Sequence, residues 1–226
     1  MKPWCVVQHV AWEGPGSIGS EARARAIELR VARMDLGDRL PSPGELGGLV
    51  VMGGPMDVGD TSAYPHLAGE RALLAAAVEA GIPTLGVCLG SQLLASALGA
   101  RVFKGPSLEI GIGDVTLTAD GERDPVLGGA GVIAPVVQWH HHTFDLPERC
   151  VRLASSRAYE NQAFRLGDRV YGIQFHPELD SPLLRAWAPH FPEGVTIDEV
   201  AHARAASAGR ALISRFFDLA SRTSTG

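Results

Sequence analysis

Short apolar runs alternate with longer amphipathic stretches through the first half of the chain. Three short runs dominated by apolar residues are typical of buried strands: 4–10, 49–52 and 83–87. Three longer stretches, rich in Ala, Leu, Glu and Arg, have helical composition: 20–34, 66–80 and 89–98. Gly81 and Gly99 follow the second and third of these stretches and predict where the helices end. Strands and helices in this order predict a parallel sheet with helices on both faces.

The second half of the chain has a different pattern. Four β-rich runs are separated by turn signals: 114–118, 132–138, 151–154 and 169–175. We expect them to form an antiparallel extension of the same sheet. A helical pattern then runs from Thr196 to about residue 221, and Glu199 follows Thr196 at the spacing of a capping box. Because the sequence has neither an internal repeat nor a linker, we expect a single domain over residues 1–226.

Composition and charge narrow the classes of function. Of the 226 residues, 46% are apolar and 20% are charged, which is an ordinary globular balance. The net charge of -5, without a local Lys/Arg cluster, argues against nucleic-acid binding, and no apolar stretch is long enough to predict a membrane span. The first ten residues are typical of a strand and not of a signal peptide. Three widely spaced cysteines predict a reduced, cytoplasmic protein. The absence of a basic patch favours a function on a small molecule or a protein partner.

A cysteine stands where a predicted strand meets a predicted helix. Cys88 follows the run 83–87, and glycines lie two residues before and two residues after it. A sharp strand-to-helix turn needs such glycines, and it exposes the central side chain at the carboxyl edge of the sheet, where a helix N-terminus favours the thiolate. We therefore interpret Cys88 as a candidate nucleophile. A buried structural cysteine is the alternative, and it is our interpretation of Cys5 and Cys150.

A candidate base and its orienting group follow the last β-rich run. His176 comes directly after the run 169–175, Pro177 cannot donate to a strand ladder, and Glu178 lies two residues beyond the histidine. If the chain turns there, Glu178 bonds the far imidazole nitrogen and leaves the near nitrogen to accept the thiol proton. An exposed histidine beside an exposed acid is the alternative for an isolated pair of this kind. Together with Cys88, the pair predicts a base and its orienting carboxylate.

These motifs together resemble the class I glutamine amidotransferase family with its Cys-His-Glu triad. The resemblance rests on GVCLGSQ at 86–92, on QFHPE at 174–178 and on Gly53-Gly54-Pro55, which matches the oxyanion loop; it covers about residues 46–179. Three further segments are similar to stand-alone proteins related to the glutaminase part of GMP synthase: EGPG at 13–16, VMGGPM at 51–56 and TFDLP at 143–147. The resemblance implies a three-layer αβα, flavodoxin-like α/β fold, with a mostly parallel sheet, a nucleophile elbow and an antiparallel extension.

The resemblance also implies a role for each site residue. Cys88 would attack the γ-amide of glutamine and form a γ-glutamyl thioester, while His176, held by Glu178, would transfer the protons. Backbone N–H groups of Gly54 and Leu89 would form the oxyanion hole. The residues expected around the bound substrate are Gly53, Gln92, Trp139 and His140. The products would be glutamate and ammonia, and the ammonia would be either released freely or passed to a separate synthase subunit.

Two other functions fit the same motifs. A hydrolase of γ-glutamyl peptides or conjugates would use the same triad and would differ in its leaving-group pocket. A non-catalytic regulatory or binding subunit is the third hypothesis, which the loss of Cys88 or His176 would have favoured. The run His140-His141-His142 suggests a metal site, but neighbouring residues on a strand point to opposite faces, so we expect no metal and no cofactor. No motif encodes the oligomeric state.

Overall fold

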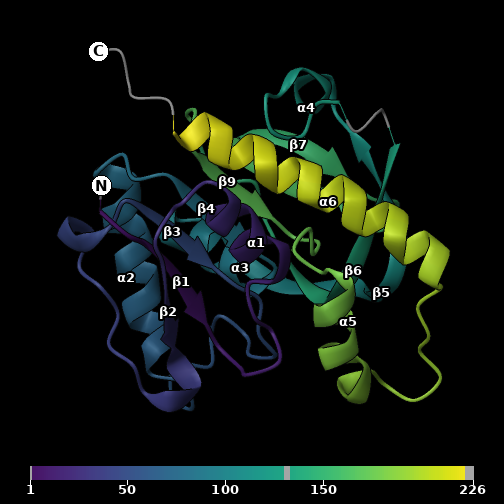
Figure 1. The fold of residues 1–226 in the computed structure, drawn as a ribbon, viewed down its shortest axis with the longest axis horizontal. Helices are drawn as coiled ribbons and strands as arrows, with labels where there is room; N and C mark the ends of the chain where they lie inside the picture. The colour runs from purple at the N-terminus through teal and green to yellow at the C-terminus, as the bar shows by residue number, and fades with distance from the viewer. Residues whose placement is uncertain (1, 130–132, 222–226) are drawn as a thin grey trace.

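A nine-stranded mixed sheet forms the centre of the computed structural model, which describes residues 2–129 and 133–221 (Figure 1). The strand order is β2-β1-β3-β4-β9-β8-β7-β5-β6. The first five strands pair in parallel: β2 (Leu29–Arg33), β1 (Trp4–Gln8), β3 (Gly48–Val51), β4 (Thr84–Val87) and β9 (Val170–Ile173). The other four pair antiparallel: β8 (Ala163–Leu166), β7 (Val151–Ser155), β5 (Val102–Leu117) and β6 (Ile133–Phe144). The parallel part has the flavodoxin-like order, with β9 as its fifth strand.

Helices cover both faces of the sheet and give the fold three layers (Figure 1). One face carries α2 (His66–Glu79) and α3 (Leu89–Ala97). The other face carries α1 (Gly16–Ala24) and the long α6 (Glu199–Ala220). The short helices and 3-10 turns are α4 (Ala119–Arg123), α5 (Ser181–Trp187), η1 (Met34–Leu36), η2 (Pro43–Glu45) and η3 (Ala188–His190). Within the described residues, no helix has both the length and the apolar character needed to cross a membrane.

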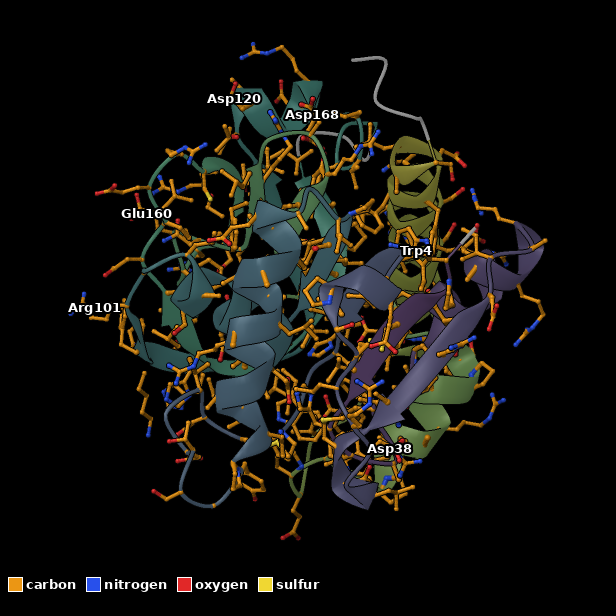
Figure 2. All side chains as sticks on the ribbon, turned by 90° about the vertical axis from the view of Figure 1, so that its left-hand side faces the viewer. Trp4, Asp38, Arg101, Asp120, Glu160 and Asp168 are labelled. Carbon is orange, nitrogen blue, oxygen red and sulfur yellow. The ribbon has the colours of Figure 1, made fainter. Side chains whose placement is uncertain are left out.

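Alternating side chains of β1 pack against the helices on the two faces of the sheet. Trp4 and Val6 belong to the core under α1 and α6, and Figure 2 shows Trp4 beside α6. The centroid of the Trp4 ring lies 4.9 Å from that of the Phe217 ring. Cys5 and Val7 belong to the opposite core, against α2 and α3. A strand buried on both faces must be apolar throughout, which explains the run seen in the sequence. The predicted α/β fold, with a parallel sheet and an antiparallel extension, is confirmed.

The predicted helix over residues 20–34 is wrong in its second half. α1 begins at Gly16 and ends at Ala24, and Ala26 takes a φ of 54°, which breaks the helix. Residues Leu29–Arg33 instead form β2, which pairs with β1 at one end of the sheet. An edge strand carries charged, solvent-facing residues, so its composition resembles that of an amphipathic helix.

The strands of the antiparallel extension differ in length and number from those predicted. β5 begins at Val102 and not at residue 114, and its pairing with β6 shifts register between Lys104 and Glu109. Glycines in this first part of β5 gave it the composition of a loop. β8, with four residues, was not predicted at all. The predicted run 132–138 lies in β6, except for residue 132, which falls outside the described residues.

The start of the last helix also differs from its prediction. α6 begins at Glu199, and the Asp198 side chain accepts a hydrogen bond from the N–H of Ala201 at 2.7 Å. Asp198 is therefore the N-cap, and the capping box predicted at Thr196 is wrong. The carboxylate of aspartate serves this position as well as a threonine hydroxyl does, so spacing alone did not distinguish the two caps.

Candidate active site

Cys88 occupies a strained turn between β4 and α3. Its φ of 50° and ψ of −108° lie in a region that residues other than glycine rarely adopt. A Cβ at Gly90 would lie 2.0 Å from the Val51 carbonyl oxygen, and a Cβ at Gly86 would lie 2.5 Å from the Gly90 carbonyl oxygen. Close backbone approach therefore requires both glycines. The turn holds Cys88 at the carboxyl end of the parallel strands, where ligands bind in folds of this type.

His176 and Glu178 form a buried pair just after β9. His176 Nδ1 lies 2.9 Å from Glu178 Oε1, and both side chains are 1% exposed. The N–H of His176 donates to the Val137 carbonyl, and the Trp187 ring packs edge-on against the imidazole with centroids 4.7 Å apart. Among the described residues, His176 Nε2 has no hydrogen-bond partner. Nε2 is consequently the nitrogen that is available to a thiol or a substrate.

Neighbouring charges favour the protonated form of His176. Burial opposes that form most strongly, yet the Glu178 carboxylate and the Cys88 sulfur together raise the pKa of His176 well above its ordinary value. The Cys88 sulfur also lies 3.6 Å from Gln174 Nε2 and 3.7 Å from the Trp139 carbonyl oxygen. A thiolate next to an imidazolium is the reactive form of a cysteine nucleophile. The arrangement therefore suits nucleophilic attack by sulfur.

The loop after β3 brings two glycines beside the sulfur. A Cβ at Gly53 would lie 3.5 Å from Cys88 Cβ, and a Cβ at Gly54 would lie 3.0 Å from both His9 Cβ and Leu89 Cδ2. His9 Nδ1 lies 2.8 Å from the Gly53 carbonyl oxygen and holds it on the side of β1. Gly54 and Leu89 thus lie next to each other at the nucleophile. Their role as oxyanion donors stays a prediction.

Two cavities meet at Cys88. The residues that line both are Gly54, Pro55, Cys88 and Trp139. The first, named the Gln92 cavity, has a volume of about 290 Å³, and its further lining includes Leu89, Gln92, His140, His141 and His142. The second, named the His176 cavity, has a volume of about 220 Å³, and its further lining is Trp12, Glu13, His176 and Trp187. The site therefore has two adjoining spaces, and Cys88 lines both of them.

The residues expected to contact substrate lie around these cavities. Gln92, Trp139 and His140 line the Gln92 cavity, and Gly53 packs against Cys88. Gln92 Nε2 donates to Gln174 Oε1 at 3.1 Å, which fixes the orientation of its amide. The structure thus brings together all the predicted site residues, while their roles in binding stay predictions.

Sequence reasoning missed Glu13, which lines the His176 cavity. Glu13 is 5% exposed, and a Cβ at Gly53 would lie 2.5 Å from Glu13 Oε2 and 3.1 Å from His176 Cε1. Burial raises the pKa of Glu13 to about 7, although the nearby His176 opposes this shift. Its position in the loop after β1 was the available signal, because the carboxyl end of β1 meets the same edge of the sheet as those of β3 and β4.

The consecutive histidines of β6 have separate partners. His140 Nε2 lies 3.0 Å from Glu109 Oε2, whereas His142 Nδ1 lies 3.0 Å from Asp57 Oδ1. Glu109 also accepts hydrogen bonds from Ser156 and Gln162, so His140 belongs to a polar network behind the cavity wall. The Glu109 side chain therefore fixes the orientation of His140 in one wall of the Gln92 cavity.

Comparison with known proteins gives consistent matches over most of the chain. Residues 17–184 match the family model described as Glutamine amidotransferase class-I. The glutamine amidotransferase-like protein YfeJ of Salmonella typhimurium is 35% identical over 177 residues, which are 76% of this chain and 74% of YfeJ. One subunit of the glutamine-hydrolysing GMP synthase of Natronomonas pharaonis is 36% identical over 63% of this chain and 71% of its own length. The crystal structure of a glutamine amido transferase from Methylobacillus flagellatus matches with a TM-score of 0.89 and 30% identity, covering 99% of this chain and 97% of the other.

Proposed function

The chain belongs to the class-I glutamine amidotransferase family, and from this premise we propose that it hydrolyses the γ-amide of glutamine through a thioester on Cys88. The observation that carries the proposal is the buried His176–Glu178 pair, whose histidine lines the same cavity as the strained Cys88. A base with an orienting carboxylate, beside a sulfur held in a strained turn at the wall of a cavity, is the arrangement that nucleophilic amide cleavage needs.

The proposed reaction has two halves. In the first, the Cys88 thiolate adds to the γ-carbonyl carbon, and the oxyanion accepts hydrogen bonds from the N–H groups of Gly54 and Leu89. The C–N bond then breaks as His176 Nε2 gives its proton to the leaving nitrogen, which departs as ammonia. In the second half, His176 takes a proton from water, the water oxygen attacks the thioester, and the C–S bond breaks. Glutamine and water thus yield glutamate and ammonia, and the thiolate is restored.

Labelling with a glutamine-mimicking electrophile tests the assignment of the nucleophile. We expect mass spectrometry to find one adduct, on Cys88, and we expect glutamine to slow its formation. Burial raises the pKa of both Cys5 and Cys150 to about 11, so neither supplies a thiolate at neutral pH. An adduct on Cys5 or Cys150 in place of Cys88 would contradict the proposal, as would the absence of glutamate release in an assay with and without candidate synthases.

Relatives described as subunits of glutamine-hydrolysing GMP synthases support a second part of the proposal, that the ammonia passes to a separate synthase subunit. The continuous sheet and the three unpaired cysteines support one amidotransferase domain over residues 1–226 that acts in the cytoplasm. Glutamine hydrolysis should then accelerate when a synthase that binds the chain is added with its ammonia acceptor. A rate that no copurifying synthase changes would contradict this part alone.

A further inference from the structure

We propose that the His176 cavity receives the amine part of a γ-glutamyl amide, so that the substrates include γ-glutamyl amides of arylalkylamines. This inference rests on the proposed thioester chemistry and names a substrate class for the same site. Its evidence lies in the position, size and lining of the His176 cavity.

The position of the cavity matches the side on which the leaving group departs. The leaving nitrogen must take its proton from His176 Nε2, so it leaves on the side of the imidazole. His176 lines the His176 cavity together with Cys88 and Gly54. The Gln92 cavity contains the same Cys88 and Gly54 without the imidazole, so the glutamyl part lies there. The amine substituent therefore extends into the His176 cavity.

The cavity is larger than the release of ammonia requires. Its volume is about 220 Å³, whereas a molecule the size of water or ammonia occupies about 30 Å³. Three indole rings line the space: Trp12, Trp139 and Trp187, with centroids 5.5 to 5.7 Å apart. Tryptophan faces and edges are suited to a flat aromatic group or to a cation.

One buried carboxylate lines this cavity. Glu13 is 5% exposed, and no arginine or lysine among the described residues forms an ion pair with it. An amine N–H would donate to this carboxylate, and above about pH 7, where Glu13 is ionised, its charge favours an amine that departs as a cation. In the same pH range, Glu13 would repel a substituent that itself carries a carboxylate, as in a γ-glutamyl dipeptide. Charge thus selects simple amines over amino acids above about pH 7.

The reaction stays balanced for this substrate class. The C–S bond forms and the C–N bond breaks, while His176 gives its proton to the nitrogen and releases the free amine. Water then cleaves the thioester, so a γ-glutamyl amide and water yield glutamate and the protonated amine. No reactant other than water is needed.

A substrate series tests the inference on the intact chain. The compounds are glutamine, γ-glutamyl methylamide, γ-glutamyl phenethylamide and γ-glutamylphenylalanine, and the readout is kcat/KM from glutamate release. We expect the phenethylamide to exceed both the methylamide and the phenylalanine compound by about tenfold or more. In Glu13→Gln, the preference for phenethylamide over γ-glutamylphenylalanine should shrink by about tenfold, while in the control Glu148→Gln, an exposed residue, it should not change.

The outcomes separate this inference from the proposed function. If glutamine is cleaved and the phenethylamide is not, the inference is overturned and the thioester proposal stands. If no compound is cleaved and none acylates Cys88, both fall. The comparison of substrates in the wild-type chain needs no variant. It therefore still tests the inference if Glu13→Gln fails to fold.

A different observation supports a second proposal, that His9 and Glu70 are positioning residues for the oxyanion loop. His9 Nδ1 lies 2.8 Å from the Gly53 carbonyl oxygen, and His9 Nε2 lies 2.8 Å from Glu70 Oε2. Both side chains are 0% exposed. Glu70 Oε1 in turn lies 2.7 Å from Nδ1 of His66, whose side chain is 20% exposed. A buried chain of hydrogen bonds thus runs from α2 to the loop at Cys88.

The chain of hydrogen bonds fixes the direction of one peptide bond. A carbonyl oxygen can only accept, so Nδ1 of His9 must carry a proton whichever form the ring takes. The peptide between Gly53 and Gly54 is trans, so its N–H points away from the carbonyl that His9 holds. Burial acts most strongly against the charged ring, yet the hydrogen bond and charge of Glu70 raise the pKa of His9 above its ordinary value. His9 Nδ1 is therefore a fixed hydrogen-bond donor to the loop at Gly53.

Two ligands separate positioning from a merely structural role. The γ-aldehyde analogue of glutamine forms a hemithioacetal with Cys88 that uses the oxyanion hole, whereas alkylation of Cys88 by iodoacetamide does not. His9→Leu should lose about 100-fold in kcat/KM and in aldehyde affinity, with the alkylation rate within about twofold of wild type. His9→Asn, which keeps a donor near the Gly53 carbonyl, should recover much of both losses, and Glu70→Gln should fall between the two.

Two results would overturn the positioning role. One is an aldehyde affinity that survives in His9→Leu while its unfolding midpoint falls. The other concerns metal binding, because ligand atoms of His9, His66 and Glu70 all lie within 4.8 Å of one another. If Zn²⁺ raises the unfolding midpoint of the wild type and Glu70→Gln abolishes the rise, the cluster is a metal site instead.

Discussion

The parallel and antiparallel halves of the sheet each hold a histidine paired with a glutamate at the site, and the two pairs differ in their surroundings. His176 and Glu178 follow a parallel strand. Nδ1 of the histidine lies 2.9 Å from Oε1 of the glutamate, and both side chains are 1% exposed. His140 and Glu109 lie within antiparallel strands at 3.0 Å, with the carboxylate 19% exposed. Glu178 has the histidine as its hydrogen-bond partner, whereas Glu109 also accepts from a serine and a glutamine.

The difference shows how one kind of contact serves two purposes. In the parallel half, the glutamate acts on the charge of a histidine whose second nitrogen is unpartnered among the described residues, as proton transfer requires. In the antiparallel half, the Glu109 carboxylate has several hydrogen-bond partners, which hold His140 in the wall of the Gln92 cavity. There, burial raises the pKa of Glu109, but the hydrogen bonds from His140 and Ser156 lower it below its ordinary value. We therefore propose that the parallel half holds the reacting groups and that the antiparallel half shapes the space around them.

Replacing the cysteine of each half by alanine should give the largest contrast in kcat. Cys88→Ala should lower kcat for glutamine by about 10⁴-fold or more, because no other group can form the thioester. Cys150→Ala, just before β7, should keep kcat within about twofold of wild type. Glutamate release measures both, and the unfolding midpoint confirms that each variant folds. Comparable losses in the two variants would remove the distinction between the halves.

Neutralising the two glutamates should give the next largest contrast. Glu178→Gln should lower kcat by about 10³-fold, and its pH profile should move to lower pH because the charge that raises the pKa of His176 is gone. Glu109→Gln should leave kcat nearly unchanged and raise KM a few-fold, since His140 loses its orientation in the Gln92 cavity. Steady-state kinetics between about pH 5 and 9 measures both. A fall of kcat in Glu109→Gln as deep as in Glu178→Gln would contradict the division of roles.

The smallest contrast is in the pH dependence of stability, and its sign differs between the halves. The pKa of Glu13 rises from 4.5 to about 7 on folding, so the free energy of unfolding should fall by up to about 3 kcal/mol as pH rises through this interval. Glu109 has a lowered pKa, so its contribution is present above about pH 4.5 and is lost as pH falls through the lowered value. Denaturant unfolding between about pH 4 and 8, relative to the variants Glu13→Gln and Glu109→Gln, measures each slope.

Three other ionisable side chains lie near Glu13 and must be kept the same in that comparison. His176 and His9 lower its pKa, and Glu178 raises it. Subtracting the Glu13→Gln curve from the wild-type curve removes most of their contribution, because the same three groups remain in both proteins. If the difference between the curves rises with pH, Glu13 is ionised in the folded state throughout and the sign given above is wrong.

The features that could be predicted from the sequence are those that depend on residues close together along the chain. The strand-to-helix switch and its glycines marked Cys88, and the end of a β-rich run marked His176 and Glu178. Glu13 and His9 escaped prediction because they meet the site only through strand order. β1 lies next to β3 although α1, β2 and two 3-10 turns separate the two strands along the chain. Glu70 reaches the same place from α2, and a glutamate within a helix is too common to indicate a functional role.

The errors in secondary structure have a related cause. Residues 29–33 pair on one side only, so their composition reports solvent exposure more than strand pairing, and Val31 is 40% exposed. The first part of β5 carries glycines that a loop would also use, and its strand conformation comes from pairing with β6 far along the chain. In both places, tertiary contacts override local preference.

The crowding between Glu13 and Gly53 limits how the sequences of this family can diverge. A Cβ at position 53 would lie 2.5 Å from Glu13 Oε2, so a side chain there requires the Glu13 carboxylate to move or position 13 to shorten. A shorter side chain at position 13, with glycine kept at 53, meets no such conflict. Substitution at position 53 should therefore be easier after position 13 has shortened, and relatives with a larger residue at the position of Gly53 should tend to carry a short one at that of Glu13.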